Sequence, residues 1–196
     1  MALRGVRGTD AAPPYDGAMR IIAGERRGAT IHAPPGTATR PTGDRVREAA
    51  YNLIGPVDDA TVLDLYAGSG ALGLEALSRG ARRVTFVESD PDAVRAINRN
   101  LDKLRLTGAI VREEDALRAL ATDAAAGRRY DLVLLDPPYE TFATVQTDLA
   151  RYLPAVLEPD GLLVVETGAR EEPALPLRTR TSRRYGAARL TLFEHE

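Results

Sequence analysis

The sequence contains no cysteine and no tryptophan, and only one of its 26 basic residues is a lysine. Without cysteine the chain forms no disulfide, no thiolate metal site and no iron–sulfur cluster, and it has no cysteine nucleophile. Long hydrophobic runs are also missing, because stretches such as 132–135 and 162–165 fall far short of the ~20 residues that cross a bilayer. Residues 1–17 lack the continuous apolar segment of a secretory signal. We therefore expect a cytoplasmic protein that has no membrane partner and binds no metal.

The balance of charge differs along the chain. The 196 residues carry a formal net charge of -2, but residues 1–55 hold eight arginines against five acidic residues, and residues 176–196 hold five against two. The segment between them holds thirteen basic and twenty-one acidic residues. Basic ends suit a polyanion and an acidic centre suits a small cationic ligand, although solvated charge on surface helices explains the same counts.

Three segments are predicted from the composition. Residues 1–18 mix Gly, Pro, Asp and Ala without hydrophobic periodicity, which is typical of a flexible tail. Residues 19–56 are expected to form a small basic N-terminal module, and residues 57–196 the main domain. The expected elements of the module are hairpin strands at 20–23 and 30–32 and a helix over 45–54.

From residue 57 onward, apolar runs of strand length alternate with amphipathic stretches of helix length, which is the pattern of an α/β fold. Two final strands around Gly186 alternate polar and apolar residues and predict an antiparallel hairpin at the sheet edge. The predicted fold class is α/β, with a mostly parallel, seven-stranded, Rossmann-like sheet. The expected strands are 61–66, 83–88, 109–112, 131–136, 161–166, 178–185 and 187–194, and the expected helices are 71–79, 91–104, 116–125 and 144–152.

A glycine-rich turn follows the first strand of the main domain. Gly68, Gly70 and Gly73 have the G-x-G-x-x-G spacing with which a backbone approaches a ligand at a helix N-terminus, although a plain strand-to-helix turn has the same spacing. Asp64, inside the strand, favours a cationic ligand over a phosphate. Glu88, at the end of the second strand, is placed to bind ribose hydroxyls. An adenosine with a positively charged tail satisfies both acids, which predicts S-adenosylmethionine, with NAD as the competing cofactor.

Asp115, directly after the third strand, fits two roles. Its carboxylate can accept a hydrogen bond from the exocyclic amine of an adenine, or it can cap the helix that begins at Ala116. The two roles are compatible, so both stay open.

The most specific motif is Asp136-Pro137-Pro138-Tyr139, which follows a fully apolar strand. The strand brings Asp136 to the carboxyl edge of the sheet, where open α/β sheets bind ligands, and the prolines stiffen the loop. The Asp136 carboxylate and the Pro137 carbonyl can accept both hydrogens of an exocyclic amine and direct its lone pair toward a methyl donor, while Tyr139 stacks on the base. An ordinary strand-terminating turn is the simpler alternative.

Three further stretches carry a family resemblance. They are R-I-I-A-G at 20–24, R-P-T-G-D-R-V-R-E at 40–48 and G-A-L-G-L-E-A-L-S-R-G at 70–80. Together with D-L-Y-A-G-S-G and D-P-P-Y, they make residues 19–194 similar to the RsmD family of class I S-adenosylmethionine-dependent methyltransferases, which methylate N2 of a guanine in bacterial 16S rRNA. The chain departs from the family pattern at Ala23, where R-I-I-G-G has a glycine, and in residues 1–18.

The resemblance implies S-adenosylmethionine as cofactor, S-adenosylhomocysteine as second product and 16S rRNA as partner, within a 30S subunit or its assembly intermediate. We expect a monomer. The implied cofactor contacts are Asp64, Tyr66, Ala67, Gly68, Gly70, Glu88, Ser89, Asp115, Ala116 and Asp136; the implied amine-binding catalytic loop is Asp136, Pro137, Pro138 and Tyr139; and the implied RNA contacts are Arg20, Arg26, Arg27, Arg40, Arg45 and Arg47.

Two other functions remain open at this point. Adenine-N6 methylation of DNA or RNA also acts on an exocyclic amine, and D-P-P-Y does not separate it from guanine methylation. A non-enzymatic RNA-binding protein of ribosome assembly could retain the cofactor fold, although the intact D-P-P-Y motif argues against it.

Overall fold

The computed structural model of the chain describes residues 19–34 and 43–196, except for the side chains of 139–141. The predictions for residues 1–18 and for Arg40 lie outside the described residues, as does the prediction for the Tyr139 side chain. Within the described part, no helix has both the length and the apolar character that crossing a membrane requires.

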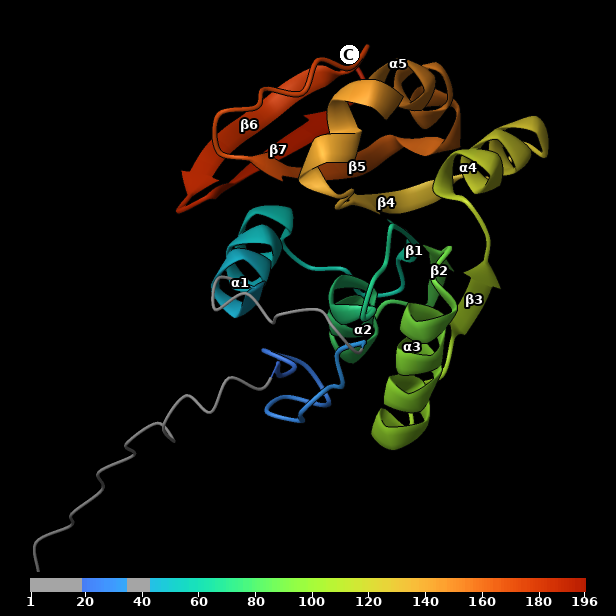
Figure 1. Ribbon diagram of the computed structural model, residues 1–196, viewed down its shortest axis with the longest axis vertical. Helices are drawn as coiled ribbons and strands as arrows, with labels where there is room; N and C mark the ends of the chain where they lie inside the picture. Colours follow the sequence, from blue (N-terminus) through green and yellow to red (C-terminus); the bar gives the residue numbers. More distant parts are fainter. Residues whose placement is uncertain (1–18, 35–42) are drawn as a thin grey trace, which may run out of the picture.

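A seven-stranded sheet runs through the centre of the structure, with strand order β3-β2-β1-β4-β5-β7-β6 (Figure 1). Strands β1 to β5 pair in parallel, whereas β7 pairs antiparallel with both β5 and β6. This topology confirms the predicted α/β class and the C-terminal hairpin. The strands are β1 (Thr61–Leu65), β2 (Arg83–Glu88), β3 (Ala109–Glu113), β4 (Tyr130–Leu135), β5 (Leu157–Gly168), β6 (Arg178–Tyr185) and β7 (Ala188–Glu194).

Helices cover both faces of the sheet, with α1, α2 and α3 on one side and α4 and α5 on the other (Figure 1). Because successive side chains of a strand point to opposite faces, Val62 packs in the cluster with α1 and α2, whereas Leu63 and Leu65 pack in the cluster with α4 and α5. Burial on both faces explains the nearly continuous apolar runs of the parallel strands. The helices are α1 (Gly43–Ile54), α2 (Ala71–Ser78), α3 (Pro91–Leu104), α4 (Ala116–Ala125) and α5 (Tyr139–Val156).

The direction of winding changes between β1 and β4. From β1 the chain proceeds to β2 and β3 on one side, and from β4 it proceeds to β5 on the other. The connections that leave the carboxyl ends of β1 and β4 therefore diverge, and open sheets bind ligands in the crevice that this divergence creates.

Two elements are longer than the sequence predicts. Helix α5 begins at Tyr139 and passes through Pro154 to Val156, instead of spanning 144–152. A proline removes one backbone hydrogen bond, but Leu153 and Val156 are buried against the sheet, which offsets that loss. Strand β5 begins at Leu157, because that residue pairs with Tyr130 ahead of an irregularity in the ladder.

The predicted N-terminal hairpin is reduced to one antiparallel bridge, between Arg20 and Thr30. Backbone hydrogen bonds flank this bridge, because Ile21 bonds to Ala29 and Gly28 and the Ile31 N–H donates to the Met19 carbonyl. Beyond Ile21 the backbone of the first strand turns toward α2. The N–H groups of Ile22 and Ala23 donate to the Glu75 carboxylate at 2.8 and 2.9 Å, instead of to a neighbouring strand.

The turn that follows packs tightly on the end of α2. The Glu25 N–H donates to the Ser78 carbonyl at 2.7 Å, and the Ser78 hydroxyl donates to the Ala23 carbonyl at 2.7 Å. Gly24 has φ +80°, and a Cβ there would lie 1.8 Å from the Ser78 carbonyl oxygen. Gly28, four residues later, has the same φ but open space around it.

The two glycines allow the stability of this contact to be measured. Both alanine variants share the cost of a left-handed backbone, ~1–2 kcal/mol, but only Gly24→Ala also forces the turn away from Ser78. We expect Gly24→Ala to lower the free energy of unfolding by ~1–3 kcal/mol more than Gly28→Ala in urea titrations. Equal losses would show that the contact with α2 adds nothing to stability.

Candidate active site

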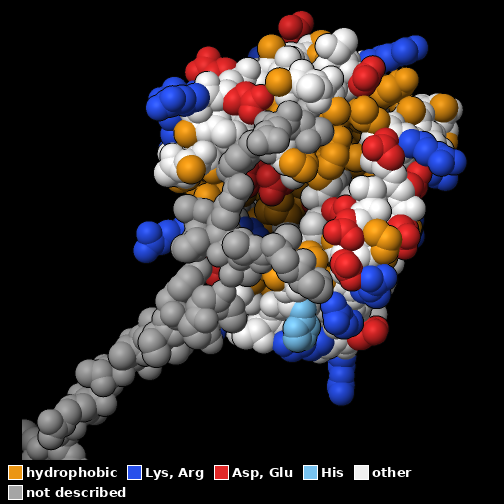
Figure 2. Space-filling model, viewed as in Figure 1, with side chains coloured by type: hydrophobic (Ala, Val, Ile, Leu, Met, Phe, Trp, Pro, Cys, Tyr) orange, Lys and Arg blue, Asp and Glu red, His pale blue; other side chains and the backbone are white. Residues whose placement is uncertain are grey.

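A cavity of about 540 Å³ opens at the carboxyl edge of the sheet, where β1 and β4 diverge. Figure 2 shows a hollow near the middle of this face, where hydrophobic and acidic side chains meet, whereas most basic side chains lie around the rim. The acidic residues of the lining outnumber its single arginine. The lining residues are Met19, Gly43, Val46, Arg47, Asp64, Tyr66, Ala67, Gly68, Ser69, Ala71, Leu72, Glu88, Ser89, Asp136, Pro137, Pro138 and Glu166.

The floor of the cavity is the glycine turn between β1 and α2. Tyr66, Gly68 and Gly70 all have positive φ, at 58°, 56° and 77°, so the chain reverses sharply after the strand. Gly70 adopts this conformation without strain, whereas a tyrosine rarely does, and strained backbone concentrates at functional sites. The turn exposes backbone of residues 66–69 to the cavity.

Asp64 lies beneath this turn, almost fully buried at 1% exposure. Its Oδ2 accepts a hydrogen bond of 2.9 Å from the Gly73 N–H. This bond requires close contact of α2 with the sheet, since a Cβ on Gly73 would lie 2.3 Å from the Phe86 ring and 2.9 Å from Asp64 Oδ2. Burial raises the pKa of Asp64 well above its ordinary value, and the neighbouring carboxylates of Asp136 and Glu88 raise it further, against the Gly73 N–H, which lowers it.

Glu88 ends β2 with both carboxylate oxygens in defined positions. Oε2 accepts from the Gly68 N–H at 2.8 Å, and Oε1 accepts from the N–H groups of Ser89 and Asp90 at 2.7 and 2.9 Å. The carboxylate is therefore fixed beside the glycine turn. Oε1 thus already accepts two hydrogen bonds, whereas Oε2 has a further lone pair with which it can accept from a ligand hydroxyl.

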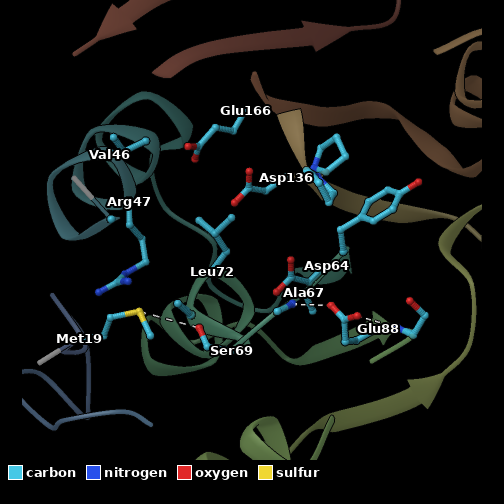
Figure 3. A pocket seen from close by; sticks show the side chains of 17 residues that line it. Met19, Val46, Arg47, Asp64, Ala67, Ser69, Leu72, Glu88, Asp136 and Glu166 are labelled. Carbon is cyan, nitrogen blue, oxygen red and sulfur yellow. Dashed lines mark hydrogen bonds between the residues drawn. The ribbon is translucent and has the colours of Figure 1, made fainter. Parts of the chain in front are cut away.

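Asp136 follows the last residue of β4 and faces the same cavity as Asp64 (Figure 3). Pro137 and Pro138 line the cavity beside it, and α5 begins directly after them. The structure thus brings together, at one site, two motifs that are widely separated in the sequence. Asp136 is exposed, so its carboxylate is accessible from the cavity.

Three of the predicted cofactor residues do not line the cavity. Gly70 is buried under the turn, and Ala116 is buried in the first turn of α4. Asp115 caps α4, because its Oδ1 accepts from the Arg118 N–H at 2.9 Å. Asp115 also faces Tyr66, whose pKa is raised first by burial and then by the Asp115 charge. The capping role of Asp115 is therefore present, and its adenine contact stays a prediction.

Arg47 does not fit the predicted contact with RNA phosphate. Its side chain is buried, and its guanidinium donates to the Arg20 carbonyl and to Asp44, with Glu75 at 3.8 Å. These partners hold Arg47 between α1 and the N-terminal segment, at the wall of the cavity. A group so enclosed cannot reach a phosphate, so the structure corrects this prediction.

The other predicted RNA-binding arginines differ in exposure. Arg27 and Arg45 are exposed, and within the described residues their side chains form no ion pair. Arg26 is half-buried and lies 3.0 Å from Glu25. Arg20 is half-buried, with its carbonyl bound by Arg47.

Several residues of the cavity wall are not among the site residues predicted from the sequence. Met19, Val46 and Leu72 are hydrophobic residues whose sequence context gives no signal of a site, and only packing brings them together. The sequence did indicate Glu166 as a possible site residue, because it is an acid at the carboxyl end of a predicted buried strand, as Glu88 and Asp136 are.

Comparisons with known proteins were consistent with these motifs. The model of the family described as Conserved hypothetical protein 95 matches residues 19–194. A Haemophilus influenzae protein named Ribosomal RNA small subunit methyltransferase D is 37% identical over 158 residues, which cover 79% of this chain and 81% of that protein. The structure of a hypothetical protein from Thermus thermophilus is 34% identical, with a TM-score of 0.77 over 90% of this chain and 99% of that one. A structure titled SAM Dependent Methyltransferase from Agrobacterium tumefaciens, 19% identical, shares the fold with a TM-score of 0.63 over 82% of this chain and 66% of that one.

The buried Asp64 gives a prediction about stability and pH. Because its pKa is raised in the folded state, the folded protein binds more protons than the unfolded chain just above pH 4, and the Asp64 contribution to stability falls as pH rises through that window. Asp64→Asn removes this penalty, so we expect the ligand-free variant to be more stable than the wild type at pH 8 and the difference to shrink toward pH 4. Urea unfolding of both proteins at several pH values measures this difference, and a difference independent of pH would contradict the prediction.

Proposed function

This chain belongs to the Conserved hypothetical protein 95 family, and we propose that it transfers a methyl group from S-adenosylmethionine to the exocyclic N2 amine of a guanine in 16S rRNA of the small ribosomal subunit. The observation that carries the proposal is a cavity that joins the glycine turn to Asp136 and Pro137. A donor at the turn and an amine at Asp136 would meet there. The Haemophilus influenzae relative, named as a small-subunit rRNA methyltransferase, supports the choice of substrate.

The chemistry of the lining supports S-adenosylmethionine over NAD. Four carboxylates face the cavity, from Asp64, Glu88, Asp136 and Glu166, whereas the guanidinium of Arg47 is already paired. Such a site suits a cationic ligand and opposes a pyrophosphate. The volume of about 540 Å³ is in the range of nucleoside-sized ligands. When bound, this cofactor supplies an electrophilic methyl group on a positively charged sulfur.

In the proposed complex, Glu88 accepts hydrogen bonds from the ribose hydroxyls, and Asp64 offsets the positive charge of the donor from beneath the turn. Asp136 and the Pro137 carbonyl accept the two amine hydrogens and direct the nitrogen lone pair toward the methyl group. The N–C bond forms as the methyl–sulfur bond breaks, with S-adenosylhomocysteine as second product. The surplus proton on nitrogen then passes to water, so no general base with a shifted pKa is needed.

Exposed arginines support binding of the RNA. Arg45 lies on the first turn of α1, next to the cavity-lining residues Gly43 and Val46. Arg27 lies farther from the cavity, on the turn that packs against Ser78 at the carboxyl end of α2. Guanidinium groups bind phosphate bidentately. Ile110 is the one large hydrophobic side chain that is exposed in the described residues, which supports a monomer. The substrate we propose is 16S rRNA within a 30S subunit or its assembly intermediate.

Adenine-N6 methylation and a non-enzymatic role are weaker alternatives. The named relative favours rRNA over DNA, and an acidic cavity that reaches Asp136 has no use in a protein that only binds RNA.

A strain that lacks this gene tests the proposal. We expect mass spectrometry of its 16S rRNA to show the loss of one N2-methylguanosine, restored by the wild-type gene. Asp136→Ala should lower methyl transfer by at least ~100-fold while cofactor binding stays measurable by calorimetry, because only the amine loses its acceptor. Asp131→Ala is the matched control, since Asp131 lies at the opposite end of β4 and accepts from Thr61. No change at any guanine in the deletion strain would refute the proposal.

The salt dependence of RNA binding tests the arginines. Each lost phosphate contact lowers the slope of log Kd against log salt concentration by ~0.7–0.9, so Arg27→Gln with Arg45→Gln should reduce it by ~1–2. Arg151→Gln is the control, because Arg151 is exposed but lies on α5, which covers the other face of the sheet (Figure 1). The prediction fails if the control and the double variant bind with the same slope.

A further inference from the structure

Glu166 lies beside Asp136 and has no part in the mechanism above. Leu135 of β4 and Val165 of β5 are partners in a parallel ladder, so the next residues along the two strands, Asp136 and Glu166, are neighbours with backbones ~4.8 Å apart. Both residues line the cavity, and Figure 3 shows their carboxylates extending into it from the same face of the sheet.

The strand order places Glu166 at the end of the cavity that would receive the base. Glu88, beside the glycine turn, ends β2, whereas Glu166 is near the end of β5, with β1 and β4 between them. Asp136 is therefore closer to Glu166 than to Glu88 along the edge of the sheet. Glu166 is half-buried, above a core that includes Val164 and Val46, and partial exclusion of water strengthens hydrogen bonds at such a position.

Guanine and adenine present different groups to two adjacent carboxylates. On its Watson–Crick edge guanine has the N2 amine next to an N1–H, so two donors lie side by side. Adenine has an amine next to an N1 lone pair, which a carboxylate repels. Enzymes that act on an extruded base read this edge by hydrogen bonds.

We propose that Glu166 is a specificity-determining residue that accepts a hydrogen bond from the guanine N1–H while Asp136 holds the N2 amine. This pair of acceptors selects guanine and rejects adenine, whose N1 would face a carboxylate. The inference rests on the proposed function, because it requires a guanine whose N2 amine lies at Asp136.

The base analogue 2-aminopurine separates this role from a structural one. It keeps the amine at C2 but has a lone pair at N1, so the wild type should methylate it poorly. Small-subunit particles from the deletion strain, and particles reconstituted with 2-aminopurine at the mapped target position, serve as the two substrates. The wild type should prefer guanine by ~100-fold or more in kcat/KM, since a site built for an N–H rejects the analogue that lacks it.

Glu166→Gln should abolish this preference. The glutamine amide can present either its oxygen to an N1–H or its NH2 group to an N1 lone pair, so the preference should shift toward equality by ~100-fold, mainly through a gain on 2-aminopurine. Cofactor binding should stay measurable by calorimetry, because Asp64, Glu88 and the glycine turn are unchanged. Glu158→Gln, the same change at the opposite end of β5, is the matched control and should behave as the wild type.

The outcomes distinguish the inference from the proposed function. A preference that shifts toward equality in Glu166→Gln supports the role in base selection. An unchanged ratio of kcat/KM between guanine and 2-aminopurine, or equal losses on both bases with cofactor binding intact, overturns it while the proposed function stands. A wild type that methylates no guanine overturns both.

Discussion

The burial of the Asp64 carboxylate is the constraint on which the geometry of the cavity depends. Its only backbone donor in the structure described is the Gly73 N–H, and that bond exists because residue 73 has no Cβ to separate α2 from the sheet. The same close packing fixes where the glycine turn lies and which of its backbone groups reach the cavity. Burying a carboxylate is costly unless its charge is compensated. A protein that retains such a group beneath an acidic cavity is suited to a ligand that brings a positive charge.

A second buried carboxylate joins the N-terminal segment to this arrangement. Glu75 of α2 accepts from the backbone of Ile22 and Ala23 and from the Arg79 side chain, and Arg47 lies 3.8 Å away. Helix α2 therefore carries the cavity floor at its start and the N-terminal segment along its side. The helix that positions Gly73 is thus also the helix that holds the turn bearing Arg27, at its end away from the cavity.

The distribution of charge follows from the order of the strands. Four carboxylates converge on the cavity because the carboxyl ends of β1, β2, β4 and β5 meet at one edge of the sheet. The exposed Arg45 lies beside the cavity lining on α1 and the exposed Arg27 lies at the far end of α2, whereas Arg47 is enclosed and acts within the fold. The net charge of -2 is therefore a sum of two separate surfaces and describes neither of them.

The sequence by itself determined the fold class, the alternation of strands and helices and much of the site, because these depend on short-range patterns. Helices α3 and α4 begin where predicted, since Asp90 and Asp115 cap them through bonds to nearby backbone N–H groups. The glycine turn and the Asp136 loop were recognisable because each lies within a few consecutive residues.

Tertiary structure alone decided the features that depend on distant segments. The first N-terminal strand leaves the hairpin after Ile21 because Glu75, 52 and 53 residues away, accepts the next two N–H groups, and α5 extends because burial offsets a proline. Arg47 is indistinguishable from Arg45 in sequence, yet one is buried and the other exposed. Glu166 became a candidate for base recognition only when the register of β4 and β5 placed it beside Asp136. Such contacts arise from packing between elements, and no local pattern records which elements will meet.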